Sequence, residues 1–369
     1  MPESRAPRGG YRQPPVNERP PHVLIVPTEG PQFPEWGPGH RNFYFEAYRS
    51  AQEKLGPQAA SVLDVAPGQP SEVWHHALID ALHDTKATHI VTHVEHDPGN
   101  SDSWTWDVAW NQLAPKWDGV FLGVMFDSAF DLVTMKTRRL ARMSENFVAV
   151  DICMPADGVL VRGRPEVGPV TMPMSRESLL MVEERLVGVE PAHDLSFIGA
   201  LYPYRVELIE KLKAAGLDVA VNPHRSDETL DFLSSRTGQP GWHDYMAGPA
   251  QSKMTVNFSR SIAGSWQQLK TRVIEATVAG TFLLTDDRDR TRLYFDPEVE
   301  FGYFGDVEQL VTVAEDWLGR ESERTRGAIA AREKAREIIL RDFWMRVDAG
   351  LARRALRPTG IGLGQSLES

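Results

Sequence analysis

The chain has 369 residues, of which 41% are hydrophobic and 25% are charged, as in an ordinary globular protein. This length exceeds the roughly 250 residues at which one hydrophobic core stops growing, so we expect two domains with a ligand cleft between them. A formal net charge of −11 disfavours wide contact with nucleic acid or an anionic membrane. No apolar run reaches the ~20 residues that span a bilayer, and the start lacks a secretory signal pattern, so we expect a cytoplasmic protein.

Residues 1–21 are rich in Pro, Arg and Gly and are expected to form a disordered leader. After them, short apolar runs alternate with amphipathic stretches, beginning with the run at 22–26. This alternation predicts a parallel sheet covered by helices on both faces, and we assign 22–175 to a Rossmann-like N-terminal domain. The single Cys153 falls in a predicted buried strand, so we interpret it as a core residue.

The alternation is interrupted at 176–193, which we expect to be a linker with one short helix. A second series of strands and helices begins at LSFIGAL and predicts another Rossmann-like domain over 194–340. Residues 341–369 are expected to form an amphipathic C-terminal helix and tail. The predicted fold class is α/β, with two doubly wound domains facing across a cleft.

Basic residues follow several predicted strands of the second domain. Ligands of open α/β sheets bind beyond the carboxyl ends of the strands, where helix N-termini and loop amides can hold phosphate. The loops at these ends contain Arg205, Arg225 and Arg260. A diphosphate ligand would explain why all three arginines follow the carboxyl ends of strands. Each arginine alone could equally be a solvated loop or helix residue.

The segment LKTRVIEATVAGTFLLTDD predicts a helix opened by Lys270, Arg272 and Glu275 and ended by Gly280. Arg272 and Glu275 are three residues apart, so both can lie on one helix face. A carboxylate beside a ligand suits the two hydroxyl groups of a ribose. The same spacing also fits an ordinary salt bridge within the helix, and spacing alone leaves both interpretations open.

The order of FIG, an arginine opening a helix, SKMTVNFS, LKTRVIEATVAGTFLLTD and FGYFGDVEQL resembles one known family, the spore-maturation-protein-like glycosyltransferases, related to glycosyltransferase group 1. That family has the pattern Arg-x-x-Glu-(x)4-Gly in the second half of a GT-B fold, and Arg272, Glu275 and Gly280 occupy those places. The resemblance covers roughly the C-terminal half. It implies transfer of a hexose-like sugar from a nucleoside-diphosphate sugar, such as a UDP-sugar, to an acceptor hydroxyl, with no obligatory cofactor or metal.

By this resemblance Glu275 binds the donor ribose, and basic residues lie near the donor diphosphate. The complete predicted donor-binding set is Arg205, Lys253, Asn257, Lys270, Arg272 and Glu275. Retaining group-1 enzymes often have two glutamates separated by seven residues, whereas this chain has Gln267 eight positions before Glu275. The stereochemistry, the sugar, the nucleotide base and the acceptor therefore stay open.

The N-terminal domain should supply the acceptor site, because its loop 28–42 is longer than the usual 2 to 6 residues of such connections. His40 in this loop is a candidate general base, since the ordinary pKa of imidazole lies near working pH. Asp127 and Glu95 follow predicted strands and are competing catalytic candidates. Retaining enzymes of group 1 can work without an enzyme base, so the choice stays open.

The sequence allows two further interpretations. His89, His93, Glu95, His96 and Asp97 resemble metal ligands in type, but such alternation is ordinary in a strand end and the helix motif HExxH is missing, so we expect no metal. The alternative to a transferase is a degenerate, non-catalytic protein of the same fold that binds a nucleotide sugar or another small ligand. The expected partners are a small-molecule donor and an unknown acceptor, and the oligomeric state stays open.

Overall fold

The structure is a computed structural model. The residues that it describes are 19–27, 43–65, 69–94, 113, 117–126, 128, 131–152, 167–199, 201–221, 246, 248–260, 267–286, 288 and 290–362. The three catalytic candidates of the N-terminal domain, His40, Glu95 and Asp127, lie outside the described residues, and so does Cys153. All six residues of the predicted donor-binding set are described.

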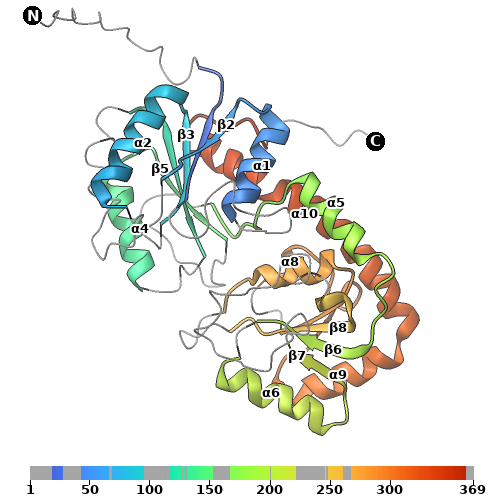
Figure 1. Ribbon diagram of the computed structural model, residues 1–369. Coiled ribbons are helices and arrows are strands. Elements are labelled where there is room, and N and C mark those ends of the chain that lie inside the picture. Colours follow the sequence, from blue (N-terminus) through green and yellow to red (C-terminus); the bar gives the residue numbers. More distant parts are fainter. Residues whose placement is uncertain are drawn as a thin grey trace, which may run out of the picture.

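The N-terminal domain is built on a five-stranded parallel sheet with the order β2-β1-β3-β4-β5. Its strands are β1 (Val23–Val26), β2 (Ala60–Val62), β3 (His89–His93), β4 (Val120–Met125) and β5 (Phe147–Asp151). Helix α1 (Phe43–Leu55) packs on one face, and α2 (Ser71–Thr85) and α4 (Asp131–Met143) pack on the other (Figure 1). Because both faces are covered, β1 and β4 are buried along their whole length, as the continuous apolar runs predict.

The C-terminal domain has a second five-stranded parallel sheet, ordered β10-β9-β8-β6-β7. Its strands are β6 (His193–Phe197), β7 (Val219–Val221), β8 (Ser252–Asn257), β9 (Phe282–Thr285) and β10 (Phe301–Tyr303). Helices α6 (Pro203–Ala214) and α9 (Val307–Gly319) cover one face, and α8 (Thr271–Val278) covers the other. Read from its own first strand, each sheet has the doubly wound order 2-1-3-4-5, so the predicted fold class is confirmed.

The last helix, α10 (Glu321–Arg353), is 33 residues long, or about 50 Å. Its middle residues Ala331, Ala335 and Ile339 pack in the core beside α8. The part of the helix after Ile339 belongs to the core beside α1 in the other domain. Its buried residues there are Phe343, Trp344, Val347 and Leu351. Figure 1 shows α10 running from one domain to the other. The sequence predicted a helical tail, but not that this tail completes the core of the N-terminal domain.

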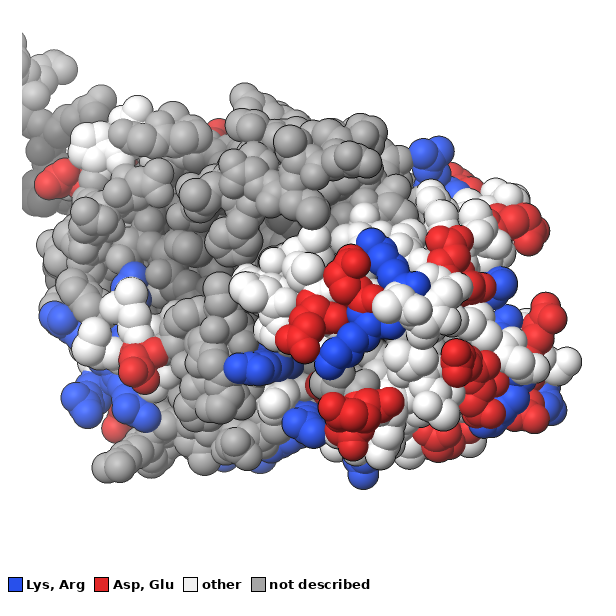
Figure 2. Space-filling model, turned by 90° about the horizontal axis from the view of Figure 1, so that it is seen from below, with Lys and Arg blue, Asp and Glu red and all other residues white. Residues whose placement is uncertain are grey.

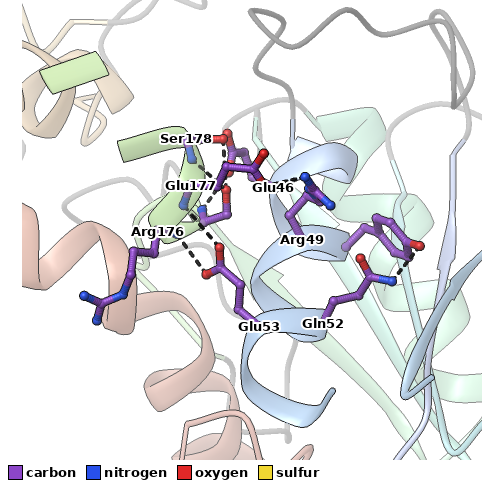
Figure 3. A network of polar contacts seen from close by, with 9 residues as sticks. Glu46, Arg49, Gln52, Glu53, Arg176, Glu177 and Ser178 are labelled. Carbon is purple, nitrogen blue, oxygen red and sulfur yellow. Dashed lines mark hydrogen bonds and ion pairs between the residues drawn. The ribbon is translucent and has the colours of Figure 1, made fainter. Parts of the chain in front are cut away.

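The other connection between the domains contains α5 (Arg176–Leu186), within the segment expected to be a linker. Figure 3 shows the start of α5 docked on α1. The buried carboxylate of Glu46 accepts a hydrogen bond from the backbone N–H of Ser175 at 2.7 Å, and Glu53 accepts from the next two backbone N–H groups at 2.8 and 3.2 Å. Carboxylates are favoured at a helix N-terminus because its unpaired N–H groups carry partial positive charge. Helix α1 therefore fixes where the linker helix begins.

Charged side chains on the described surface are mixed in sign. Figure 2 shows acidic and basic groups interspersed on the described part of one face, and on α6 the pairs Glu207–Lys211 and Glu210–Lys213 lie at 3.2 and 3.4 Å. Among the described helices, none combines the length and the apolar character that a membrane span requires.

His89, once considered as a metal ligand, ties the C-terminal tail to β3. Its side chain is fully buried, with Nε2 3.0 Å from the carbonyl oxygen of Arg357 and Nδ1 2.8 Å from the hydroxyl of Thr88. A carbonyl oxygen only accepts, so Nε2 carries the proton of a neutral ring. Desolvation lowers the pKa of His89 to about 4. The described residues contain no group of His, Cys, Asp and Glu placed to hold a metal ion.

A His89→Gln variant tests this role. Between the unfolded pKa of 6.5 and the folded pKa of about 4, the unfolded chain binds a proton that the folded chain excludes, so wild-type stability falls as pH falls through this window. Glutamine does not titrate. We therefore expect the difference in free energy of unfolding between wild type and variant, measured with urea, to shrink by about 2 kcal/mol from pH 7 to pH 5. A difference that stays constant contradicts the assignment.

Candidate functional site

The strand order of the second sheet places its topological switch point between β6 and β8, because the chain continues from β6 to β7 on one side and from there to β8 on the other. In open α/β sheets, ligands bind beyond the carboxyl ends of the strands at this point. Helix α6 begins shortly after β6 ends, at Pro203, and α8 begins at Thr271. Side chains from both helix starts and from the end of β8 meet here.

Arg205 lies in the first turn of α6 and is only 3% exposed. Its Nη2 donates to the carbonyl oxygen of Arg260 at 3.1 Å, and its Nε donates to the hydroxyl of Tyr204 at 2.8 Å. The guanidinium carbon also lies 4.6 Å from the ring centroid of Tyr202, within the range of a cation–π interaction. Arg205 is thus held in one orientation beyond the end of β6.

Arg272, in the first turn of α8, reaches toward the ends of β6 and β8. Its Nη1 lies 3.4 Å from Oδ1 of the buried Asn257, and its guanidinium carbon lies 4.9 Å from the ring centroid of Phe197. Asn257 in turn donates from Nδ2 to the hydroxyl of Thr285 at 3.2 Å, which orients its carbonyl oxygen toward Arg272. Two residues of the predicted donor-binding set are therefore in contact.

Gly199, just after β6, makes room for Arg272. A Cβ built on Gly199 would lie 2.0 Å from Nη2 of Arg272, and the backbone φ of +134° is one that L side chains rarely adopt. Glycine is therefore favoured at position 199 for two reasons. Its backbone has a positive φ, and the guanidinium group of Arg272 occupies the space that a Cβ would take.

Substituting Gly199→Ala should displace Arg272 as well as strain the backbone. The matched control is Gly188→Ala, which also has a positive φ (+76°) but no atom within 4 Å of a built Cβ. Positive φ costs a non-glycine residue about 1 kcal/mol or more, so both variants lose stability. We expect Gly199→Ala to lose at least about 1 kcal/mol more in chemical denaturation, because its φ lies farther from the left-handed region and because its Cβ meets Arg272. Equal losses would show that Arg272 moves aside at no cost.

Glu275 lies one turn after Arg272 and is 6% exposed. It lines a cavity at the junction of the two domains, with Lys270 of the C-terminal domain and Thr171 of the connecting segment. Lys270 donates from Nζ to Oε1 of Gln268 at 2.7 Å. The Thr171 hydroxyl is buried and has no hydrogen-bond partner among the described residues, so a small polar group or a water in the cavity could satisfy it.

A second cluster of polar residues lies beyond the carboxyl ends of β8 and β9. The hydroxyl of Ser259 donates to the side-chain oxygen of Gln267, and the backbone N–H of Ser259 lies 3.4 Å from a carboxylate oxygen of Asp286. The other oxygen of Asp286 accepts from the backbone N–H of Arg288 at 3.2 Å. Burial raises the pKa of Asp286, although these hydrogen bonds oppose the shift. Gln267, which stands near the place of the first glutamate in the two-glutamate pattern, therefore lies at the same edge of the sheet as Ser259 and Asp286.

Lys253 does not lie with the other predicted donor-binding residues. It is the second residue of β8, at the amino end of the strand, and its Nζ donates to a carboxylate oxygen of Asp194 at 2.8 Å. Asn257 marks the carboxyl end of the same strand, about 13 Å away at 3.3 Å per residue. Lys253 therefore faces the opposite edge of the sheet, and we leave it out of the proposed site.

Two residues of the site received no role from the sequence, although both lie in the segment 199–205 that follows a predicted strand. Tyr204 precedes Arg205 in the stretch YPYR, and Gly199 follows the strand in FIG. A tyrosine beside a helix-opening arginine, and a glycine directly after a buried strand, are the signals that could have found them. Neither signal tells which distant side chain the residue contacts.

Most residues of the candidate site fall within the range that a known family matches. A family model described as glycosyl transferase-like matches residues 205–346, a range that begins at Arg205 and includes all of α8. No curated protein matches the chain. The match covers the domain that holds the candidate site and extends along α10.

Solved structures of glycosyltransferases have a similar fold. An alpha-glucosyltransferase in complex with UDP-glucose and DNA containing an abasic site has a TM-score of 0.52 at 13% identity, over 86% of this chain and 94% of that one. Sucrose-phosphate synthase from Thermosynechococcus elongatus has a TM-score of 0.49 at 12% identity, over 91% and 99% of the two chains. The protein therefore has the GT-B fold of two Rossmann-like domains, and residues 205–346 match a glycosyl transferase-like family model.

Proposed function

We propose that the protein is a glycosyltransferase that takes a sugar from a nucleoside-diphosphate sugar held by the C-terminal domain and passes it to an acceptor hydroxyl. The observation that carries this proposal is the convergence of Arg205 and Arg272 at the switch point of the second sheet, each from the first turn of a helix. The matching family model over 205–346 supports the same function.

The first part of the proposal is a diphosphate site at the two arginines. The N-termini of α6 and α8 bring the positive ends of two helix dipoles to this edge. Guanidinium groups bind phosphate oxygens in a fixed fork geometry. A protein with a formal net charge of −11 can therefore bind a small anion through a local positive potential. Lys270, at the N-cap of α8, would add a third cation.

The second part is a ribose site at Glu275. The carboxylate is buried in the junction cavity, one helical turn from Arg272, so a ligand whose diphosphate lies on the arginine would extend along α8 toward it. A carboxylate that accepts hydrogen bonds from both hydroxyls of a ribose would be satisfied in this buried position. The hydroxyl of Thr171, which lines the same cavity and has no hydrogen-bond partner among the described residues, would hydrogen-bond the same ligand.

During transfer the bond from the anomeric carbon to the diphosphate oxygen breaks, and a bond to the acceptor oxygen forms. Negative charge develops on the departing diphosphate, and arginines already held by their neighbours stabilise it without reorganising. The acceptor proton leaves with a base or with the leaving group. His40, Asp127 and Glu95 stay the predicted candidates for a base.

The finer assignments are part of this proposal. We propose a member of the spore-maturation-protein-like group, on the pattern of Arg272, Glu275 and Gly280, and a hexose as the sugar transferred. The UDP-glucose bound in the similar alpha-glucosyltransferase favours a UDP-sugar as the first donor to test. A cytoplasmic location stays a prediction from the sequence.

The test is a thermal-shift and calorimetric screen against UDP, GDP, ADP, dTDP and their sugars. A ligand at 100 times its Kd stabilises the native state by about 2.7 kcal/mol, so one nucleotide series should raise the melting temperature clearly. In Glu275→Gln the loss of charged hydrogen bonds to the ribose should weaken that Kd about 10- to 100-fold. Release of the free nucleoside diphosphate from its sugar by wild type, but not by the variant, would show turnover.

The control is Glu300→Gln, which also removes a buried carboxylate but at the contact with Lys334. It should change stability without changing the ligand-induced shift. No stabilisation of wild type by any of these compounds at millimolar concentration would contradict the proposed function. Equal nucleotide affinity in wild type and Glu275→Gln would remove Glu275 from the site.

A further inference from the structure

We infer that Tyr204 is a positioning residue that joins the arginines of α6 and of the loop after β8 into one diphosphate-binding unit. The inference rests on the proposed function and concerns a residue that received no role from the sequence. Tyr204 belongs to the first turn of α6 and Arg260 to the segment after β8, so the contact links two sides of the switch point.

The hydroxyl of Tyr204 both donates and accepts a hydrogen bond. It donates to the carbonyl oxygen of Arg260 at 2.6 Å and accepts from Nε of Arg205 at 2.8 Å. A carbonyl only accepts and a guanidinium only donates, so the direction of both hydrogen bonds is fixed. Arg205 also donates from Nη2 to the same carbonyl oxygen at 3.1 Å, which closes a triangle between the phenol, the guanidinium and the backbone.

The ring of Tyr204 makes a second set of contacts. The guanidinium carbon of Arg260 lies 5.1 Å from its centroid, within cation–π range. The ring of Tyr202, at the N-cap of α6, stacks on that of Tyr204 with 6.4 Å between the ring centroids and an interplanar angle of 27°. The guanidinium carbon of Arg205 lies 4.6 Å from the ring centroid of Tyr202. One tyrosine therefore orients Arg205 through its hydroxyl and Arg260 through its ring and its hydroxyl.

A neutral phenol suits this position better than a carboxylate would. Burial raises the pKa of Tyr204, while the cations Arg205, Arg272 and Arg260 act in the opposite direction, so the group stays protonated near neutral pH. A carboxylate could also hold two guanidinium groups, but it would cancel the charge that a diphosphate needs. The hydroxyl fixes Arg205 and leaves its positive charge available.

The experiment compares Tyr204→Phe with wild type by calorimetry, using three probes: the nucleoside diphosphate that binds wild type most tightly, the corresponding nucleoside, and inorganic pyrophosphate. Phenylalanine keeps the ring and loses both hydrogen bonds. We expect about 10-fold weaker binding of the nucleoside diphosphate and of pyrophosphate, and a change below about 2-fold for the nucleoside. The control is Tyr303→Phe, an exposed phenol of β10, which should change none of the three.

Selective loss on the phosphate-bearing probes supports the inference, whereas equal losses on nucleoside and diphosphate would show a merely structural role and overturn it. Unchanged binding in Tyr204→Phe would also overturn it while leaving the proposed function intact. A wild-type protein that binds no nucleoside diphosphate would instead refute the proposed function. If Tyr204→Phe fails to fold, Tyr204→His is measured instead with the opposite expectation, because a neutral imidazole keeps a ring with one donor and one acceptor. The nucleoside diphosphate and pyrophosphate should then bind within about 2-fold of wild type, and a loss of about 10-fold for both would overturn the inference.

Discussion

The sharing of α10 between two hydrophobic cores is the constraint on which the rest of the molecule depends. Ile339 packs in one core and Phe343 in the other, a single helical turn apart. The first connection is tied to the same turn, because the backbone N–H of Met174 donates to the carbonyl of Ile339 at 3.1 Å and that of Thr171 donates to Asp342 at 2.8 Å. Both passages of the chain between the domains therefore meet at the cavity that holds Glu275.

From this junction the site extends along α8 to the switch point. Glu275 lies at the junction cavity, Arg272 at the ends of β6 and β8, and Arg205 across from it on α6. The two guanidinium groups are fixed by aromatic rings and by neutral oxygens as well as by their own helices. An acidic protein thus gains a preorganised cationic edge, which is what binding and departure of a diphosphate require.

Much of this could be predicted from residue order, because local pattern decides local structure. The apolar runs at β1 and β9, the start of α8 near Arg272 and its end at Gly280 follow from burial and from a positive φ of +82°. Contacts between distant segments could not be predicted. The amphipathic pattern of α10 is the same on both sides of Ile339, so it cannot tell which core each turn enters, and nothing local to Gly199 names Arg272 as its neighbour. A resemblance in order also does not give the edge of the sheet on which a residue such as Lys253 lies.

The measurement that tests the central claim most directly is a crystal structure of the protein with its tightest-binding nucleoside diphosphate. The account predicts the diphosphate within hydrogen-bond distance of the guanidinium groups of Arg205 and Arg272, and the ribose hydroxyls on the carboxylate of Glu275. A nucleotide bound at the opposite edge of the sheet, beside Lys253 and Asp194, would contradict it.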